Sequence, residues 1–110
     1  MRLQVNFFKT ANNKQPVRDW LKELPAEDRK TIGNDLKTAQ FGWPLGMPLI
    51  RKLEADLWEV RSRLHNRIAR VIFTVDGDRM ILLHGFIKKS QKTPKSDLQL
   101  ARQRLIALRG

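Results

Sequence analysis

Cationic side chains and one aromatic residue gather in the stretch 84–95, directly after an apolar segment. The apolar run ends at Phe86, and four lysines follow within eight residues, namely Lys88, Lys89, Lys92 and Lys95. Cations can hold the phosphates of a nucleic acid while an aromatic ring stacks on a base. A solvated, lysine-rich loop between a strand and a helix would have the same composition. The stretch therefore suggests phosphate and base recognition without requiring it.

Two arginines upstream of this stretch strengthen the suggestion. Arg61 and Arg70 each lie in a segment where apolar and polar residues alternate, which is typical of a β-strand. A two-residue turn at 65–66 places Arg61 opposite Arg70. Like charges at opposed positions repel each other, so an anion between them is favoured, and guanidinium groups bind phosphate with two hydrogen bonds. Alternatively, Glu59 and Asp56 neutralise the arginines in surface ion pairs.

A third strand follows, and its predicted register extends the basic face. A three-residue turn at 76–78 places Arg70 opposite His84, and Ile81, Leu83, Gly85 and Ile87 then share the apolar face that packs on helices. The basic face gains three residues in neighbouring rows: Arg63, Phe86 and Lys88. Gly85 introduces an alternative, because a glycine inside a strand often marks a bulge that would change the register and move Phe86 into the core.

These residue types suit the cleavage of RNA without a metal ion. Arg61 and Arg70 would clamp the phosphate, and fixed cations would stabilise the charge that develops as the 2′-hydroxyl attacks it. Lys88 or His84 would move protons and Phe86 would stack on a base. DNA lacks the 2′-hydroxyl and would be excluded. We expect no metal and no cofactor, because this face has no pair of acidic residues. His84 could equally be an ordinary hydrogen-bonded strand residue.

The elements that must position these residues can be inferred from periodicity and from helix-breaking residues. Residues 2–8 alternate as a strand, and a helix begins at Pro16 with apolar residues at helical spacing. A second helix follows Pro25 and ends at Gly42. A turn-rich connector then leads to three antiparallel strands within residues 57–88.

A last helix is predicted after the lysine-rich stretch. Thr93 would be its N-cap and Pro94 its first residue, while Arg102, Arg104 and Arg109 would stay solvated. The order of elements is strand, helix, helix, three strands, helix (β-α-α-β-β-β-α). This order predicts one α+β domain over residues 1–110, with helices packed against a small antiparallel sheet.

Composition narrows the class of partner. The 110 residues carry a formal net charge of +11, with +3 from residues 1–50 and +8 from residues 51–110. This asymmetry favours nucleic acid as the partner, with an acidic protein second. A membrane partner is not expected, since no apolar run approaches the roughly 20 residues of a membrane span. Without cysteines and without the apolar core of a signal peptide, a cytoplasmic location is expected.

Three motifs together resemble a known family. They are Leu57-Trp58-Glu59-Val60-Arg61, then Arg70-Val71-Ile72-Phe73, then Leu83-His84-Gly85-Phe86-Ile87-Lys88-Lys89 with Thr93-Pro94 and Ala101. The chain is similar in these motifs to the phage-derived HigB-like branch of the RelE/ParE toxin superfamily. The resemblance covers most of the chain and is densest from about Lys52 to Arg104.

The resemblance implies the compact RelE-like fold and the role of toxin in a type II toxin–antitoxin pair. It implies cleavage of mRNA on the ribosome, neutralisation by a small antitoxin with a helix-turn-helix domain, and contact with operator DNA only through that antitoxin. Arg61 stands where such toxins carry a catalytic lysine or arginine, Arg70 where they hold the phosphate, and Lys88 or Lys89 where they carry a basic residue. The base-stacking tyrosine of RelE is missing, because the chain contains no tyrosine. Phe86 is its expected substitute.

Two other functions remain open at this point. The superfamily also contains ParE-type proteins, which inhibit DNA gyrase without cutting RNA. A basic RNA-binding module without catalytic activity would also agree with the composition. For the ribosome-dependent nuclease, Lys92 and Lys95 are expected to guide the chain onto ribosomal RNA. Arg63, Phe86 and Lys89 are also expected to contact RNA.

Overall fold

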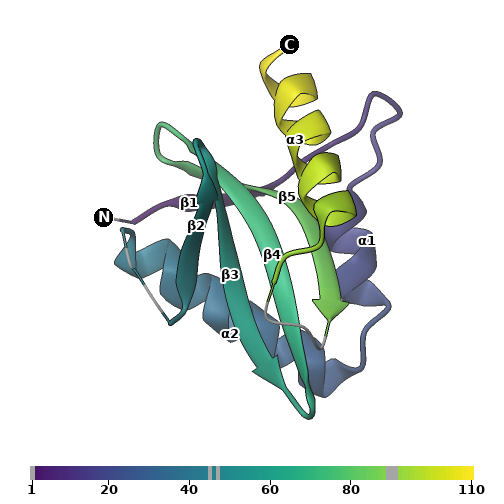
Figure 1. Ribbon diagram of the computed structural model, residues 1–110, viewed down its shortest axis with the longest axis vertical. Helices are drawn as coiled ribbons and strands as arrows, with labels where there is room; N and C mark the ends of the chain where they lie inside the picture. The colour runs from purple at the N-terminus through teal and green to yellow at the C-terminus, as the bar shows by residue number, and fades with distance from the viewer. Residues whose placement is uncertain (1, 45, 47, 89–91) are drawn as a thin grey trace.

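The computed structural model describes residues 2–44, 46, 48–88 and 92–110 (Figure 1). The elements in chain order are β1 (Gln4–Phe7), α1 (Pro16–Lys22), α2 (Ala26–Gly42), β2 (Ile50–Glu54), β3 (Leu57–Leu64), β4 (Arg67–Asp76), β5 (Arg79–Lys88) and α3 (Lys95–Arg109). The strands form one sheet in the order β1-β5-β4-β3-β2. All neighbours are antiparallel except β1 and β5, which are parallel. The α+β prediction is confirmed.

Strand β2 is an element that the sequence analysis did not predict. Its register against β3 shifts between Lys52 and Glu54, so that Leu53 is an extra residue in the strand. This irregularity breaks the two-residue alternation by which a strand is recognised. Pairing with β3, rather than local pattern, therefore holds this edge strand in place.

The hairpin of β3 and β4 has the predicted register, whereas that of β4 and β5 does not. Arg61 lies opposite Arg70 as expected. Arg70, however, lies opposite Phe86, and His84 lies opposite Ile72. One cause is the turn, which has two residues rather than three because Asp76 pairs with Arg79. The other is a bulge in β5 between Leu82 and His84, where Leu83 is the extra residue.

The changed register sends the side chains of β5 to other faces than predicted. Met80 and Leu82 pack in a core with α1 and α2. Ile81 and Leu83, which were expected on that face, pack instead in a second core with Phe86 and α3. Figure 1 shows α1 and α2 behind the sheet and α3 in front of it. The sheet is therefore covered by helices on both faces.

Helix α3 is anchored to the sheet by charged contacts as well as by apolar packing. Arg102 donates to both carboxylate oxygens of Glu54 on β2, at 2.9 and 2.6 Å. This pair holds the pKa of Glu54 below its ordinary value, chiefly through the hydrogen bond. Arg109 pairs with Asp56 at 3.0 Å. Asp56, which was considered as a partner of the strand arginines, therefore binds the C-terminal end of α3.

Within the described residues, no helix is long and apolar enough to cross a membrane.

Gly85 has a packing role and is not the bulge that its position suggested. A Cβ atom at this residue would lie 2.4 Å from two carbons of the Trp20 ring, closer than atoms can approach. The indole of α1 therefore packs directly on the backbone of β5, and only glycine leaves room for it.

Alanine substitution at two glycines should distinguish the effect of side-chain packing on stability from the effect of backbone conformation. Gly85→Ala is expected to lower the free energy of unfolding by about 1–3 kcal/mol, because the added methyl group overpacks against Trp20. The control is Gly33→Ala in α2, where a Cβ would meet nothing within 4 Å. That change should raise stability by about 0.5–1 kcal/mol through helix propensity. Chemical denaturation of both variants measures the difference, and equal effects would contradict the proposed contact.

Candidate functional site

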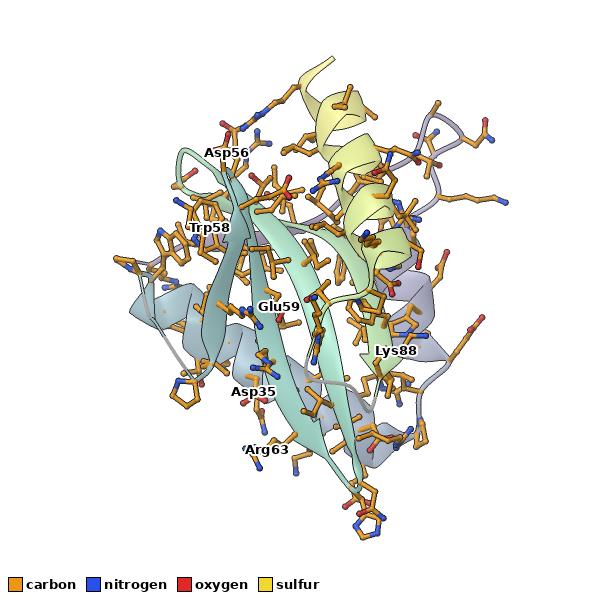
Figure 2. The ribbon with its side chains drawn as sticks, in the orientation of Figure 1. Asp35, Asp56, Trp58, Glu59, Arg63 and Lys88 are labelled. Atoms are coloured by element: carbon orange, nitrogen blue, oxygen red, sulfur yellow. The ribbon has the colours of Figure 1, made fainter. Side chains whose placement is uncertain are left out.

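Glu59 on β3 is the buried centre of a cluster of arginines. Glu59 and Arg70 are both fully buried, with 0% of their surface exposed. The Thr93 hydroxyl donates to Oε2 of Glu59 at 2.8 Å and accepts from Nη1 of Arg70 at 3.4 Å. Nε of Arg61 lies 3.9 Å from Oε1 of Glu59. Figure 2 labels Glu59 near the middle of the sheet. Thr93, just before α3, thus bridges the carboxylate and the buried guanidinium.

Thr93 was expected to cap α3 and does not. The N-cap residue is Pro94, and no side chain caps the helix. The Thr93 hydroxyl has a single proton, which goes to the Glu59 carboxylate. The stronger acceptor at this position is a buried carboxylate, whose burial without hydrogen bonds would be costly.

A third arginine, Arg51 on β2, completes the cluster. It lies opposite Glu59 in the sheet and is exposed. The pKa of Arg70 is lowered chiefly by burial, raised by the charge of Glu59, and lowered by the charges of Arg61 and Arg51. The charges of Arg61 and Arg51 therefore act on Arg70 together with the single opposing charge of Glu59, which leaves an excess of positive charge around it. The sequence analysis missed Arg51 because it missed β2, and it considered Glu59 only as a surface partner.

The accessible cations lie around this buried centre. Arg61 has 14% of its side chain exposed, whereas Arg63 and Lys88 are classed as exposed. Arg63 and Lys88 both flank Ile68 in the next row of the sheet, and Figure 2 shows Lys88 at the end of β5. The structure thus brings Arg61, Arg63 and Lys88 to one face as predicted. Direct contact of Arg70 with a phosphate, as expected from the sequence, disagrees with the complete burial of this side chain.

His84 is held in contacts that leave it no free ring nitrogen. Nε2 lies 2.7 Å from Oδ1 of Asp97, and Nδ1 lies 3.4 Å from Nη1 of Arg104. Arginine only donates, so Nδ1 accepts and Nε2 carries the proton toward Asp97. Arg104 also donates to the Leu83 carbonyl oxygen at 2.8 Å. In this arrangement His84 anchors α3, and it is not poised for the proton transfer that was predicted.

Two further expectations about this region change with the structure. Phe86 is 7% exposed and stacks on His84 with ring centroids 5.4 Å apart. It is a core residue and its ring offers little surface to a base, but the bulge that shifts the register lies at Leu83 and not at Gly85. Arg104 is partly buried rather than solvated, and burial lowers its pKa.

The remaining predicted residues lie near the start of α3. Lys92 and Lys95 are exposed on either side of Thr93, the residue that reaches Glu59. Lys89 falls outside the described residues. In the part of the chain that is described, no three His, Asp or Glu side chains lie together in a way that could hold a metal ion.

The buried carboxylate should be essential for stability. Glu59→Gln leaves Arg70 buried without its counter-charge and is expected to lower the free energy of unfolding by about 3 kcal/mol. Glu23→Gln, an exposed substitution with the same change in charge, should stay within about 0.5 kcal/mol of the parent. Denaturant titrations measure both. The double variant Glu59→Gln/Arg70→Met should recover part of the loss, because neither charge remains. Strictly additive losses would contradict the coupling.

Comparison with known proteins gives the chain a family. No curated protein matches it. The family model described as phage-derived protein Gp49-like (DUF891) matches residues 19–106, most of the chain and all of the arginine cluster. This is a RelE/HigB-like family of the toxin type, associated with toxin–antitoxin systems, and a cognate antitoxin is the partner that it implies. The expected resemblance is confirmed at this level, while the HigB branch stays a prediction. The chain belongs to the phage-derived Gp49-like family of toxin-type proteins.

Proposed function

We propose that this protein is the toxin of a type II toxin–antitoxin pair and that it cleaves mRNA on the ribosome. The observation that carries the proposal is the group of Arg51, Arg61 and Arg70, whose charges act on one another beside the buried carboxylate of Glu59. Its excess positive charge borders a face that also presents Arg63 and Lys88. Such an arrangement suits a phosphodiester that becomes more negative as it reacts.

The cleavage chemistry divides between charge stabilisation and proton transfer. The RNA 2′-oxygen forms a bond to phosphorus while the bond from phosphorus to the 5′-oxygen breaks. The 2′-hydroxyl gives its proton to a water molecule at the ribosomal site, and the leaving 5′-oxygen gains one. Arg61 and Arg51 would contact the phosphate oxygens, and the exposed Lys88 would donate to the 5′-oxygen. Arg70 is assigned a positioning role beneath them, since it is buried against Glu59 and Thr93.

The low exposure of Arg61 favours catalysis by preorganised charge. A guanidinium near the carboxylate of Glu59 at 3.9 Å is held in place before the substrate arrives. Arginine stays protonated and is a poor general base. A toxin that mainly supplies positive charge would depend on the ribosome, because the ribosome holds the mRNA in place for the reaction.

The positive charge of the wider surface supports binding to the ribosome. The net charge of +11 favours association with ribosomal RNA, toward which Lys92 and Lys95 would guide the chain. An antitoxin with a helix-turn-helix domain would neutralise the toxin and make the contacts with operator DNA. The toxin would act in the cytoplasm, where translating ribosomes are found.

Expression in bacterial cells tests the proposal directly. We expect growth arrest and discrete cuts within translated codons of a reporter mRNA, mapped by primer extension. Arg61→Ala should reduce cutting about 10²- to 10³-fold, because it removes a fixed cation from the reacting phosphate. Arg79→Ala is the matched control, a strand arginine that is exposed and paired with Asp76 at 3.0 Å. It should cut like the parent chain.

Other outcomes would contradict the proposal. Intact mRNA with induced DNA damage would identify a ParE-type gyrase inhibitor instead. Growth arrest that persists in full in Arg61→Ala, with the fold preserved by circular dichroism, would show that the arginine face is not the active surface.

The role given to Arg51 can be tested by its neighbour on the same strand. Arg51→Ala is expected to reduce cutting about tenfold, because Arg51 contributes charge to the cluster around Glu59. Lys52→Ala removes an adjacent cation whose Nζ lies 5.8 Å from the Trp58 ring, away from that cluster. It should leave cutting unchanged in the same primer-extension assay. Equal losses in the two variants would mean that general charge, rather than the cluster, matters.

A further inference from the structure

A cavity of about 410 Å³ opens beside Arg61, where the sheet loses its edge strand. Strand β2 pairs with β3 only between Leu57 and Val60, and the backbone amide of Arg61 donates to the Leu49 carbonyl oxygen at 2.9 Å. Beyond that point β3 continues along α2. The cavity is lined by Thr31, Asp35, Pro48, Leu49, Arg61, Arg63 and Ile68. Its size is in the range of small-molecule sites and is sufficient for a nucleotide.

The wall formed by α2 presents hydrogen-bond acceptors. Thr31 and Asp35 are four residues apart and so lie on the same side of the helix. The Thr31 hydroxyl donates its proton to the Glu27 carbonyl oxygen at 3.2 Å, and its oxygen can therefore only accept a further bond. Within the described residues, the Asp35 carboxylate has no ion pair and no hydrogen bond. Figure 2 shows Asp35 and Arg63 beside the same part of β3.

The other walls have the chemistry of a nucleotide site. Arg61 and Arg63 are cations that can hold phosphates, and Pro48, Leu49 and Ile68 are apolar surfaces against which a base can lie. Arg61 belongs both to this cavity and to the cluster around Glu59. A strand of RNA whose phosphate contacts Arg61 could thus place a neighbouring base in the cavity.

We propose that this cavity binds a guanine base of single-stranded RNA, recognised by the carboxylate of Asp35. The inference rests on the proposed function in one respect, that RNA is the substrate. An ionised carboxylate only accepts, and it matches two adjacent donors. Guanine has such a pair on its Watson–Crick edge, at N1 and N2. Adenine and cytosine each place an acceptor beside a single donor, and uracil places one donor between two acceptors. Asp35 is thereby a specificity-determining residue.

Substitution of Asp35 should change the base preference. Asparagine presents one acceptor and one donor, which matches the N6 donor and N1 acceptor of adenine. It can still form a pair with O6 and N1 of guanine, but it no longer accepts from N1 and N2 together. Asp35→Asn should therefore reduce the preference for guanine and raise the affinity for adenine relative to guanine. Asp19→Asn on α1 is the matched control, an exposed carboxylate with the same change in charge. It should retain the preference for guanine.

The experiment measures binding of fluorescent 2′-O-methyl RNA hexamers to the full chain by anisotropy, since these probes cannot be cleaved through the 2′-oxygen. One probe contains uridine throughout, and two others carry a single central guanosine or adenosine. The parent chain should bind the guanosine probe about tenfold more tightly than the uridine probe. Asp35→Asn should reduce this advantage and raise the affinity for the adenosine probe relative to the guanosine probe.

The outcomes separate this inference from the proposed function. Equal affinities for all probes, no binding of any probe, or a guanine preference that is undiminished in Asp35→Asn would each overturn the inference. Cleavage of mRNA in cells is scored separately. A chain that prefers guanine but cuts no mRNA would retain the site and lose the nuclease proposal. A chain that cuts mRNA without any preference for guanine would do the reverse.

Discussion

The contact on which the rest of this structure depends is the burial of the Glu59 carboxylate beside the guanidinium groups of Arg61 and Arg70. Glu59 is fully buried, yet it is surrounded by more positive charge than it can neutralise. A buried carboxylate beside a buried guanidinium is costly to uncouple, because either group alone would be a buried charge without a counter-charge. Glu59 therefore fixes the positions of Arg61 and Arg70. This arrangement leaves an excess of positive charge. A bound anion would reduce the repulsion between the guanidinium groups.

The same contact connects the sheet to the last helix. Thr93 reaches Glu59 from the residue pair that precedes α3, and the pair of His84 and Asp97 joins β5 to the first turn of that helix. The arginine-bearing face of the sheet and the position of α3 are thus coupled through hydrogen bonds. This explains why Thr93 does not cap α3 and why His84 is not available to carry protons. Both residues have structural roles instead. Their polar groups are already used in holding the element that covers the site.

The strand registers and site residues could be predicted only where apolar and polar residues alternate clearly along the sequence. Arg61 opposite Arg70 was predictable, because β3 alternates clearly and a two-residue turn sets its register with β4. The register of β5 was not, since Met80, Ile81, Leu82 and Leu83 are all apolar and both faces of the sheet are covered. Without alternation, nothing in the sequence marked the bulge at Leu83. Arg51 was missed for a related reason, the extra residue in β2. Asp35 carried no signal at all, because a polar residue on a predicted helix indicates only a solvated position.

The central claim is that a fixed group of arginines promotes attack by the RNA 2′-hydroxyl on mRNA held by the ribosome. The most direct measurement is the chemistry of the fragment ends produced by the purified chain on mRNA in translating ribosomes. Attack by the 2′-hydroxyl leaves an upstream fragment ending in a 2′,3′-cyclic phosphate and a downstream fragment beginning with a 5′-hydroxyl, and these ends are expected. A 3′-hydroxyl with a 5′-phosphate would mean attack by water, and no cleavage at all would exclude the nuclease. Either result would contradict the account.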